Sequence, residues 1–119
     1  MNPASSSAPV SGKIFVSPGV LLTVARLAAL SVPGVAGMSP VPGGVNRPFR
    51  RGAAQGVRLE TRAEEVSAEL FLVLHPESDA REVARRVQLE VCRAITEIVG
   101  MKVGQVVVHI EDIVPAPSE

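Results

Sequence analysis

The chain has 119 residues, of which 46% are apolar, 20% charged and only 3% aromatic. This length favours one domain, and the apolar content is sufficient for a core and excludes wholesale disorder. Without Trp or Tyr, the core must consist of Val, Leu, Ile and Ala, and modules that stack nucleic-acid bases on aromatic platforms are disfavoured. A single cysteine, Cys92, excludes an internal disulfide framework and fits a reducing compartment.

Charge and hydropathy indicate a cytoplasmic protein. The segment Met1–Gly12 has neither a charged residue nor an apolar stretch, so we expect no secretory signal. The most apolar stretch, Val20–Leu30, is too short to span a bilayer and contains Arg26. Twelve basic and twelve acidic residues balance, but seven of the basic ones lie at or before Arg62 and eleven of the acidic ones after it. This segregation can support self-association or partner choice, although two ordinary solvated faces are the favoured explanation.

The first half of the chain predicts a strand, a helix, a short strand and a loop. Residues 1–11 form a low-complexity tail that we expect to be disordered, and residues 13–16 form a strand candidate. A helix should start at Ser17-Pro18, with the Ser17 side chain as its cap, and end near Ser31 before Pro33-Gly34. Its expected buried stripe is Val20, Leu21, Val24, Leu27 and Ala28.

A short strand is expected over 35–38 and a mobile loop over 39–55. The loop is rich in Pro and Gly and carries a basic trio, Arg47, Arg50 and Arg51. This trio could contact an anionic surface such as lipid headgroups or RNA, although a solubilising mobile segment is the commoner explanation. We expect the loop to be dispensable for folding.

The second half predicts a hairpin, a helix and a final strand. Alternating residues give strands over 57–62 and 66–74, with Phe71 and Val73 on the face of the second strand that lies away from the helices. A helix capped by Ser78 or Asp79 and ended by Gly100 has one uninterrupted apolar arc. The arc comprises Ala80, Val83, Ala84, Val87, Val91, Ala94, Ile95 and Ile98. A β-branched strand over 103–113 precedes a short tail, 115–119.

These elements predict an α+β fold in one domain over residues 12–114. Two helices would cover one face of a mostly antiparallel sheet, in the order strand, helix, minor strand, strand, strand, helix, strand. A ferredoxin-like arrangement would place strands 13–16 and 66–74 at the centre. Apolar surface would then remain outside the core, which predicts a partner or self-association surface at Leu22, Leu30, Phe71 and Val73. The alternative is that the loop or the N-terminal tail covers this surface.

No arrangement of residues predicts catalysis, a cofactor or a metal. His75 and His109 are separated by a helix, and no histidine is near Cys92 in sequence. Gly34-Val35-Ala36-Gly37 matches the GxxG of a KH loop, but it follows one helix only and carries no charge. We therefore predict a protein that is not an enzyme and binds other proteins, with a KH-like RNA-binding module as the alternative.

Several segments together resemble the alkaline shock protein family of bacterial envelope stress response proteins. The resemblance rests on the ordered runs GKIFVSPGV at 12–20, VPGVAGM at 32–38, GVRLE at 56–60, the strand 70–74, the helix 83–100 and VVVHI at 106–110. It covers about residues 12–114. The loop 39–55 is not part of the family pattern, so its arginines inherit no role.

The resemblance implies a cytoplasmic protein of cell-envelope homeostasis that has no enzymatic activity. It also implies self-association and attachment to the inner face of the membrane through a small integral-membrane partner. The sequence identifies neither that partner nor the inducing stress.

Overall fold

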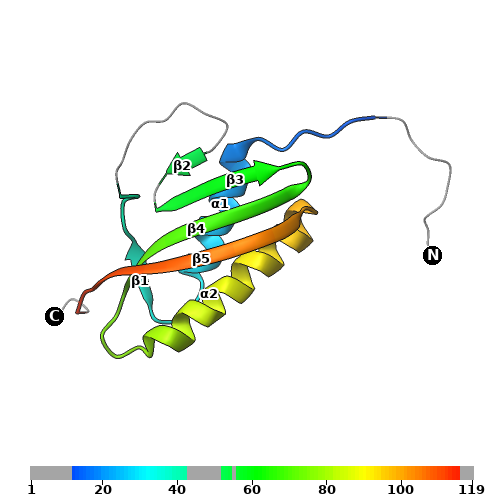
Figure 1. Ribbon diagram of the computed structural model, residues 1–119. Helices are drawn as coiled ribbons and strands as arrows, with labels where there is room; N and C mark the ends of the chain where they lie inside the picture. The colour runs from blue at the N-terminus through cyan, green and yellow to red at the C-terminus, as the bar shows by residue number, and fades with distance from the viewer. Residues whose placement is uncertain (1–11, 43–51, 55, 116–119) are drawn as a thin grey trace, which may run out of the picture.

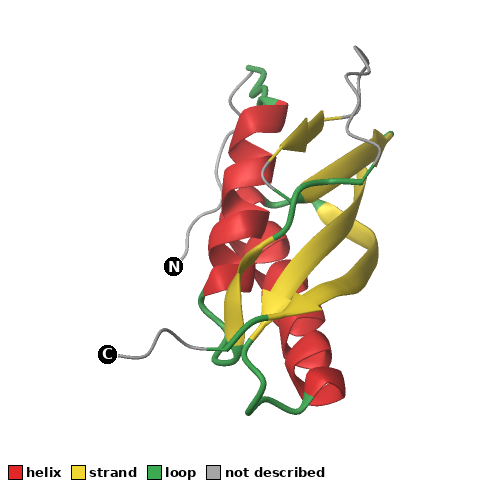
Figure 2. Ribbon diagram, turned by 90° about the vertical axis from the view of Figure 1, so that its left-hand side faces the viewer, coloured by secondary structure: helices red, strands yellow, loops and turns green. Residues whose placement is uncertain are grey.

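The computed structural model describes residues 12–42, 52–54 and 56–115, which form a sheet with helices against one of its faces (Figures 1 and 2). The elements in chain order are α1 (Pro18–Leu30), β1 (Val35–Met38), β2 (Gly52–Ala54), β3 (Val57–Arg62), β4 (Glu65–Leu74), α2 (Ala80–Ala94), a π-helical continuation η2 (Ile95–Val99) and β5 (Lys102–Ile113). The predicted fold class, an α+β sandwich of two layers, is confirmed.

Strand β4 is the centre of the sheet. On one side it pairs antiparallel with β3 over Glu65–Leu70 and with β1 over Leu72–Leu74. On its other side β5 runs parallel to it along the whole length, because α2 crosses back over the sheet between the two strands. Strand β2 pairs antiparallel with the outer side of β3. The sheet is therefore mostly antiparallel, with one parallel pair that matters below.

The core lies between the sheet and the helices. Alternate residues of β4 point to the helices and are all buried: Val66, Ala68, Leu70, Leu72 and Leu74. They meet Leu21, Ala25 and Ala29 of α1 and Val83, Val87 and Val91 of α2. Within the described part of the chain, no polar or charged residue is buried.

The segment 13–16 is not a strand, contrary to the prediction. Ile14 and Phe15 are 91% and 86% exposed, and no hydrogen-bonded pairing involves them. The physical reason is that no central position remains, since β5 takes one side of β4 and β3 and β1 take the other. The ferredoxin-like arrangement with this strand at the centre is therefore wrong.

Helix α1 has the predicted length but a different orientation and cap. Ser17 makes no side-chain cap, and its carbonyl accepts from Val20 instead. The buried side is Leu21, Ala25 and Ala29, while Val20 and Leu27 of the predicted stripe are exposed. Small alanines let the helix lie close to its neighbours, which places the bulkier Leu27 outside.

The second helix begins as predicted, since the Asp79 side chain accepts from the Glu82 N–H, and Gly100 ends it in the left-handed region at φ 82°. Its last turn departs from the predicted arc. The π-helical turn η2 inserts an extra residue, which rotates Ile98 away from the core to 71% exposure. Val99 packs against the core instead.

The predicted loop 39–55 contains the short strand β2 at Gly52–Ala54. The basic trio Arg47, Arg50 and Arg51 lies outside the described residues, as do the two tails 1–11 and 116–119.

Candidate functional site

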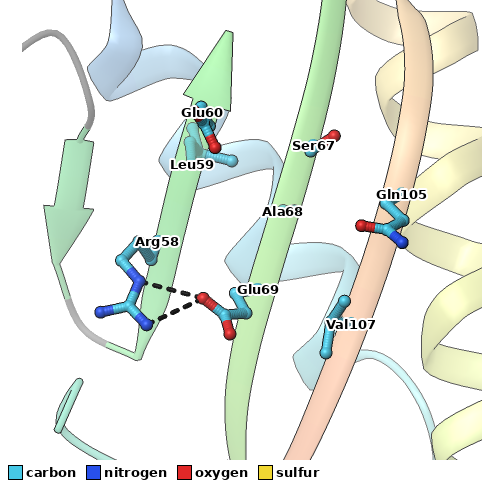
Figure 3. A pocket seen from close by; sticks show the side chains of 8 residues that line it. All are labelled: Arg58, Leu59, Glu60, Ser67, Ala68, Glu69, Gln105 and Val107. Atoms are coloured by element: carbon cyan, nitrogen blue, oxygen red, sulfur yellow. Dashed lines mark hydrogen bonds and ion pairs between the residues drawn. The ribbon is translucent and has the colours of Figure 1, made fainter.

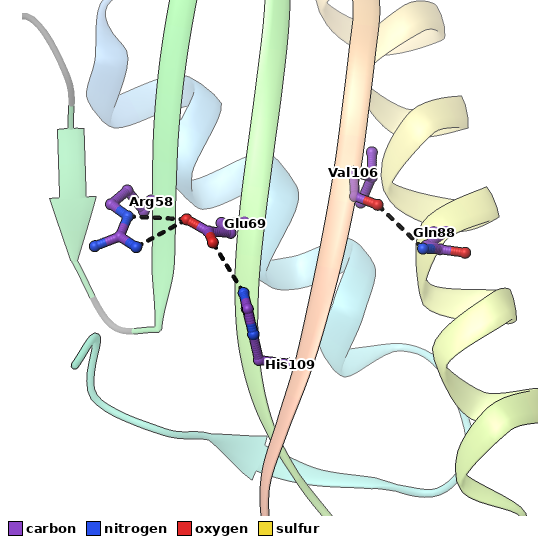
Figure 4. A network of polar contacts seen from close by, with 5 residues as sticks. All are labelled: Arg58, Glu69, Gln88, Val106 and His109. Carbon is purple, nitrogen blue, oxygen red and sulfur yellow. Dashed lines mark hydrogen bonds and ion pairs between the residues drawn. The ribbon is translucent and has the colours of Figure 1, made fainter.

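The face of the sheet that the helices leave open carries a polar network across three strands (Figure 4). Arg58 of β3 lies directly opposite Glu69 of β4, and His109 of β5 reaches Glu69 from the other side. Arg58 Nε and Nη2 lie 3.0 and 2.9 Å from Glu69 Oε1, and His109 Nε2 lies 2.9 Å from Glu69 Oε2. Each carboxylate oxygen therefore has its own partner.

This network lowers the pKa of Glu69. Partial burial alone would raise that pKa, but the hydrogen bonds from His109 and Arg58 and the positive charge of Arg58 outweigh it. A carboxylate can only accept, so His109 serves as the donor through Nε2–H. Glu69 is thus an anchor whose charge is satisfied by its neighbours.

Phe71 lies beneath this network. Its ring stacks on the His109 ring at a centroid distance of 4.6 Å with an interplanar angle of 5°, and Arg58 Cζ lies 5.5 Å from its centroid. Phe71 is on the face away from the helices, as predicted, but it is only 3% exposed. The prediction of an open apolar side chain there is wrong, because polar groups with apolar stems and rings cover it. Val73 is half-buried.

Beside the network, the open face forms a shallow pocket of about 350 Å³ (Figure 3). Its lining residues are Arg58, Leu59, Glu60, Ser67, Ala68, Glu69, Gln105 and Val107. The pocket is polar, but two of its three charged lining residues, Arg58 and Glu69, bind each other. Charge pairing across the floor of the pocket leaves it poorly suited to capture a small charged ligand.

A different surface is apolar and open: the outer side of α1. Leu27 is 55% exposed, and Val20 and Leu30 are exposed on the same side of the helix. Leu22, the other predicted surface residue of α1, is half-buried and packs against the core. Of the four residues predicted for an interaction surface, the structure therefore leaves Leu30 exposed and joins it to Val20 and Leu27.

The remaining predicted candidates lie apart. His75 directly follows β4, where its N–H donates to the Gly34 carbonyl, and its Nδ1 is buried without a partner in the structure as described. Cys92 is half-buried on α2. Over residues 12–42, 52–54 and 56–115, no group of three or more His, Cys, Asp or Glu could hold a metal ion.

The GxxG segment also has a structural role. Gly34 adopts φ 103°, and a Cβ there would lie 2.7 Å from Val83 Cγ2. Its carbonyl accepts from the His75 N–H, and Ser78 Oγ donates to the same oxygen at 3.4 Å. Gly37 lies in β1, so the segment joins a helix to a strand and not two helices.

The fold and its surfaces define a small α+β domain with a paired polar face and an open apolar helix. The sequence model of the alkaline shock protein 23 family, described by a cell envelope-related function, matches residues 6–115. Because this match spans nearly the whole chain, the chain belongs to that family, as the resemblance predicted. No relative among the curated proteins matches.

Solved structures titled MamM CTD share the fold. Against the copper form, the chain is 19% identical with a TM-score of 0.60, and the match covers 86% of this chain and 92% of that one. Against a zinc form of a variant, it is 21% identical with a TM-score of 0.57, and the match covers 79% and 84%. At such identities the likeness shows the fold alone.

Sequence reasoning missed the network and, apart from Leu30, the residues of the outer side of α1. Arg58, Glu69 and His109 are far apart in sequence, and only the strand pairing brings them together. A signal existed for α1, since its apolar residues extend beyond one stripe, but the pattern does not say which side is outermost. In the part of the chain that the structure describes, no helix is long and apolar enough to cross a membrane.

Proposed function

We propose that this chain is a protein-interaction module, without enzymatic activity, that acts at the cytoplasmic face of the cell envelope. The family supports the connection to the envelope. The observation that carries the interaction role is the apolar outer side of α1, where Val20, Leu27 and Leu30 are exposed together. Exposed apolar side chains that lie together usually mark a binding surface.

The open sheet face supports the absence of catalysis in this proposal. A general acid or base needs a group whose proton is free to move to a substrate. Here Glu69 binds Arg58 and His109, and His109 stacks on Phe71. These side chains are therefore engaged with one another, not with a substrate. The partner that fits the outer side of α1 is a protein with an apolar docking segment, such as a small integral-membrane protein that anchors the domain.

The test is envelope fractionation of the tagged protein in its native host. Leu27→Glu places a charge in the proposed contact and should shift the protein from the envelope fraction to the soluble fraction. Gln105→Glu adds the same charge on the opposite layer of the molecule, in the pocket lining, and should leave the distribution unchanged. Both residues are exposed, so both variants should melt like the wild type. Equal envelope binding by the two variants would contradict the proposed surface.

The RNA-binding alternative needs a GxxG loop between two helices with backbone groups free for phosphate. The Gly34 carbonyl is instead held by His75 and Ser78, and β1 follows directly. Salt-sensitive RNA binding at submicromolar affinity would be required to restore that alternative.

A further inference from the structure

The longest strand of the molecule lies at an edge of the sheet. Strand β5 has twelve residues and pairs with β4 on one side, and no other described strand pairs with it (Figure 1). A long exposed edge offers a row of backbone donors and acceptors to another strand, and proteins usually shorten or block such edges. The edge of β5 therefore calls for an explanation.

The hydrogen bonds identify which residues point outward from this edge. The Leu74 carbonyl accepts from Val114, so it faces β5, whereas Phe71 exchanges bonds with Gly56 and Ser39 on the opposite side of β4. Backbone groups alternate along a strand, so Leu70 and Leu72 also face β5. In a parallel pair, a residue whose backbone faces the neighbouring strand bonds the two residues on either side of its partner. Leu70 is the partner of Val108 and Leu72 that of Ile110, so their bonds go to the neighbours of Val108 and Ile110. The N–H and C=O groups of Val108 and Ile110 therefore point outward.

Val106 follows the same alternation, and an independent contact supports it. Gln88 Nε2 of α2 donates to the Val106 carbonyl at 3.1 Å, which places that carbonyl on the outer edge (Figure 4). The outward groups are thus Val106, Val108 and Ile110, evenly spaced over the regular part of the strand.

The charges of β5 are arranged for pairing with itself. Lys102 is at one end and Asp112 at the other, and both are exposed. Lys102 pairs with Glu65 and Asp112 with Val73, and both of those β4 residues belong to the open face of the sheet. Lys102 and Asp112 therefore share that face, even though a β-bulge lies between each of them and the centre of the strand.

We propose that two copies of the chain associate through antiparallel pairing of their β5 edges, on a two-fold axis at Val107. This register sets Val106 opposite Val108 of the second copy as a hydrogen-bonded pair, and Lys102 opposite Asp112 at each end. The exposed Gln88 side chain gives up its bond to the Val106 carbonyl when this pair forms. A two-fold axis perpendicular to a sheet requires paired residues on the same face, which Lys102 and Asp112 satisfy. The result is one continuous sheet across two copies.

This inference rests on the proposed interaction role and adds a second surface to it. The helix surface on α1 would bind the envelope partner, and the β5 edge would bind another copy. Closed two-fold pairing occupies the edge, which explains why a strand of this length has no other strand beside it and only the Gln88 contact at Val106.

The test is sedimentation of the full chain at micromolar concentration, with two charge-reversed variants. In the Lys102→Glu dimer an acid faces an acid at each of the two ends, and in the Asp112→Lys dimer a base faces a base at each end, so each variant alone should weaken the dimer at least about tenfold. Mixing the two variants restores an opposite-charge pair at both ends, so a heterodimer should form at nearly wild-type affinity. Thermal melting should show all three chains equally folded, because both residues are exposed.

A monomeric wild type would overturn the inference, as would variants that dimerise like the wild type or a mixture that stays monomeric. Open chains or trimers would also contradict it, because two-fold pairing closes. A monomeric chain that still fractionates with the envelope through Leu27 would overturn this dimer and leave the proposed function intact. If the chain dimerises as proposed but Leu27→Glu still fractionates with the envelope, the proposed function would be overturned and the dimer would stand.

Discussion

The two faces of strand β4 are stabilised by different chemistry. The helix-covered face has five aliphatic or small side chains, all buried against α1 and α2. The open face has Ser67, Glu69, Phe71 and Val73. Its one buried ring, that of Phe71, is covered by the ion-paired Arg58 and by His109. One face excludes water by helix packing, and the other does so locally by a polar network. In a two-layer fold, the uncovered face of the sheet can therefore bury an aromatic residue without a third layer.

The largest effect should come from charging the helix-covered face. Val87 is fully buried among apolar residues, so Val87→Asp leaves an unpaired carboxylate in the core and should cost about 3 kcal/mol or more. Denaturant unfolding followed by circular dichroism measures this loss. Leu89→Asp on the exposed side of the same helix is the matched control and should cost far less. Similar losses for both would show that α2 does not cover the core as described.

The next effect concerns the open face. Phe71→Ala removes a ring that is only 3% exposed and should cost about 3 kcal/mol, near the low end for a buried Phe. Phe15→Ala, at 86% exposure, is the control and should be close to neutral. If Phe71→Ala were equally neutral, the polar network would not protect a buried residue, and the open face would contribute less to stability than we infer.

How much of this was available from the sequence depends on the range of the interactions. Periodicity and capping residues predicted α1, the hairpin and α2, because these depend on neighbours within a few positions, as Asp79 and Gly100 illustrate. The burial of Phe71 was not predictable, since its cover comes from Arg58 and His109 on two other strands. The strand predicted over 13–16 was wrong for a related reason, because β-propensity does not show whether a position beside another strand is free.

A smaller effect should follow the charge of Glu69. Its pKa is lowered in the folded chain, so the network adds stability above the ordinary carboxyl range and loses it as pH falls through the lowered pKa. Glu69→Gln should cost roughly 1 kcal/mol near neutral pH and little under acid conditions. Thermal melting across an acid-to-neutral pH series should show the two proteins converging at the acid end. A constant gap at all pH values would mean that the charge of Glu69 does not matter.

The smallest effect should come from the outer side of α1. Leu27 is exposed, so Leu27→Glu should change the free energy of unfolding by no more than about 0.5 kcal/mol. A large loss of stability, measured by the same denaturant unfolding, would place Leu27 in the core and remove it from the proposed contact surface.

The central claim is that the outer side of α1 contacts a protein of the envelope, and photo-crosslinking in the native host tests it most directly. A photoreactive amino acid at Leu27 should crosslink to a membrane-fraction protein, whereas the same amino acid at Glu60, which is exposed on the opposite layer and away from β5, should not. Crosslinks from Glu60 alone, or none from Leu27 while the protein remains in the envelope fraction, would contradict the account.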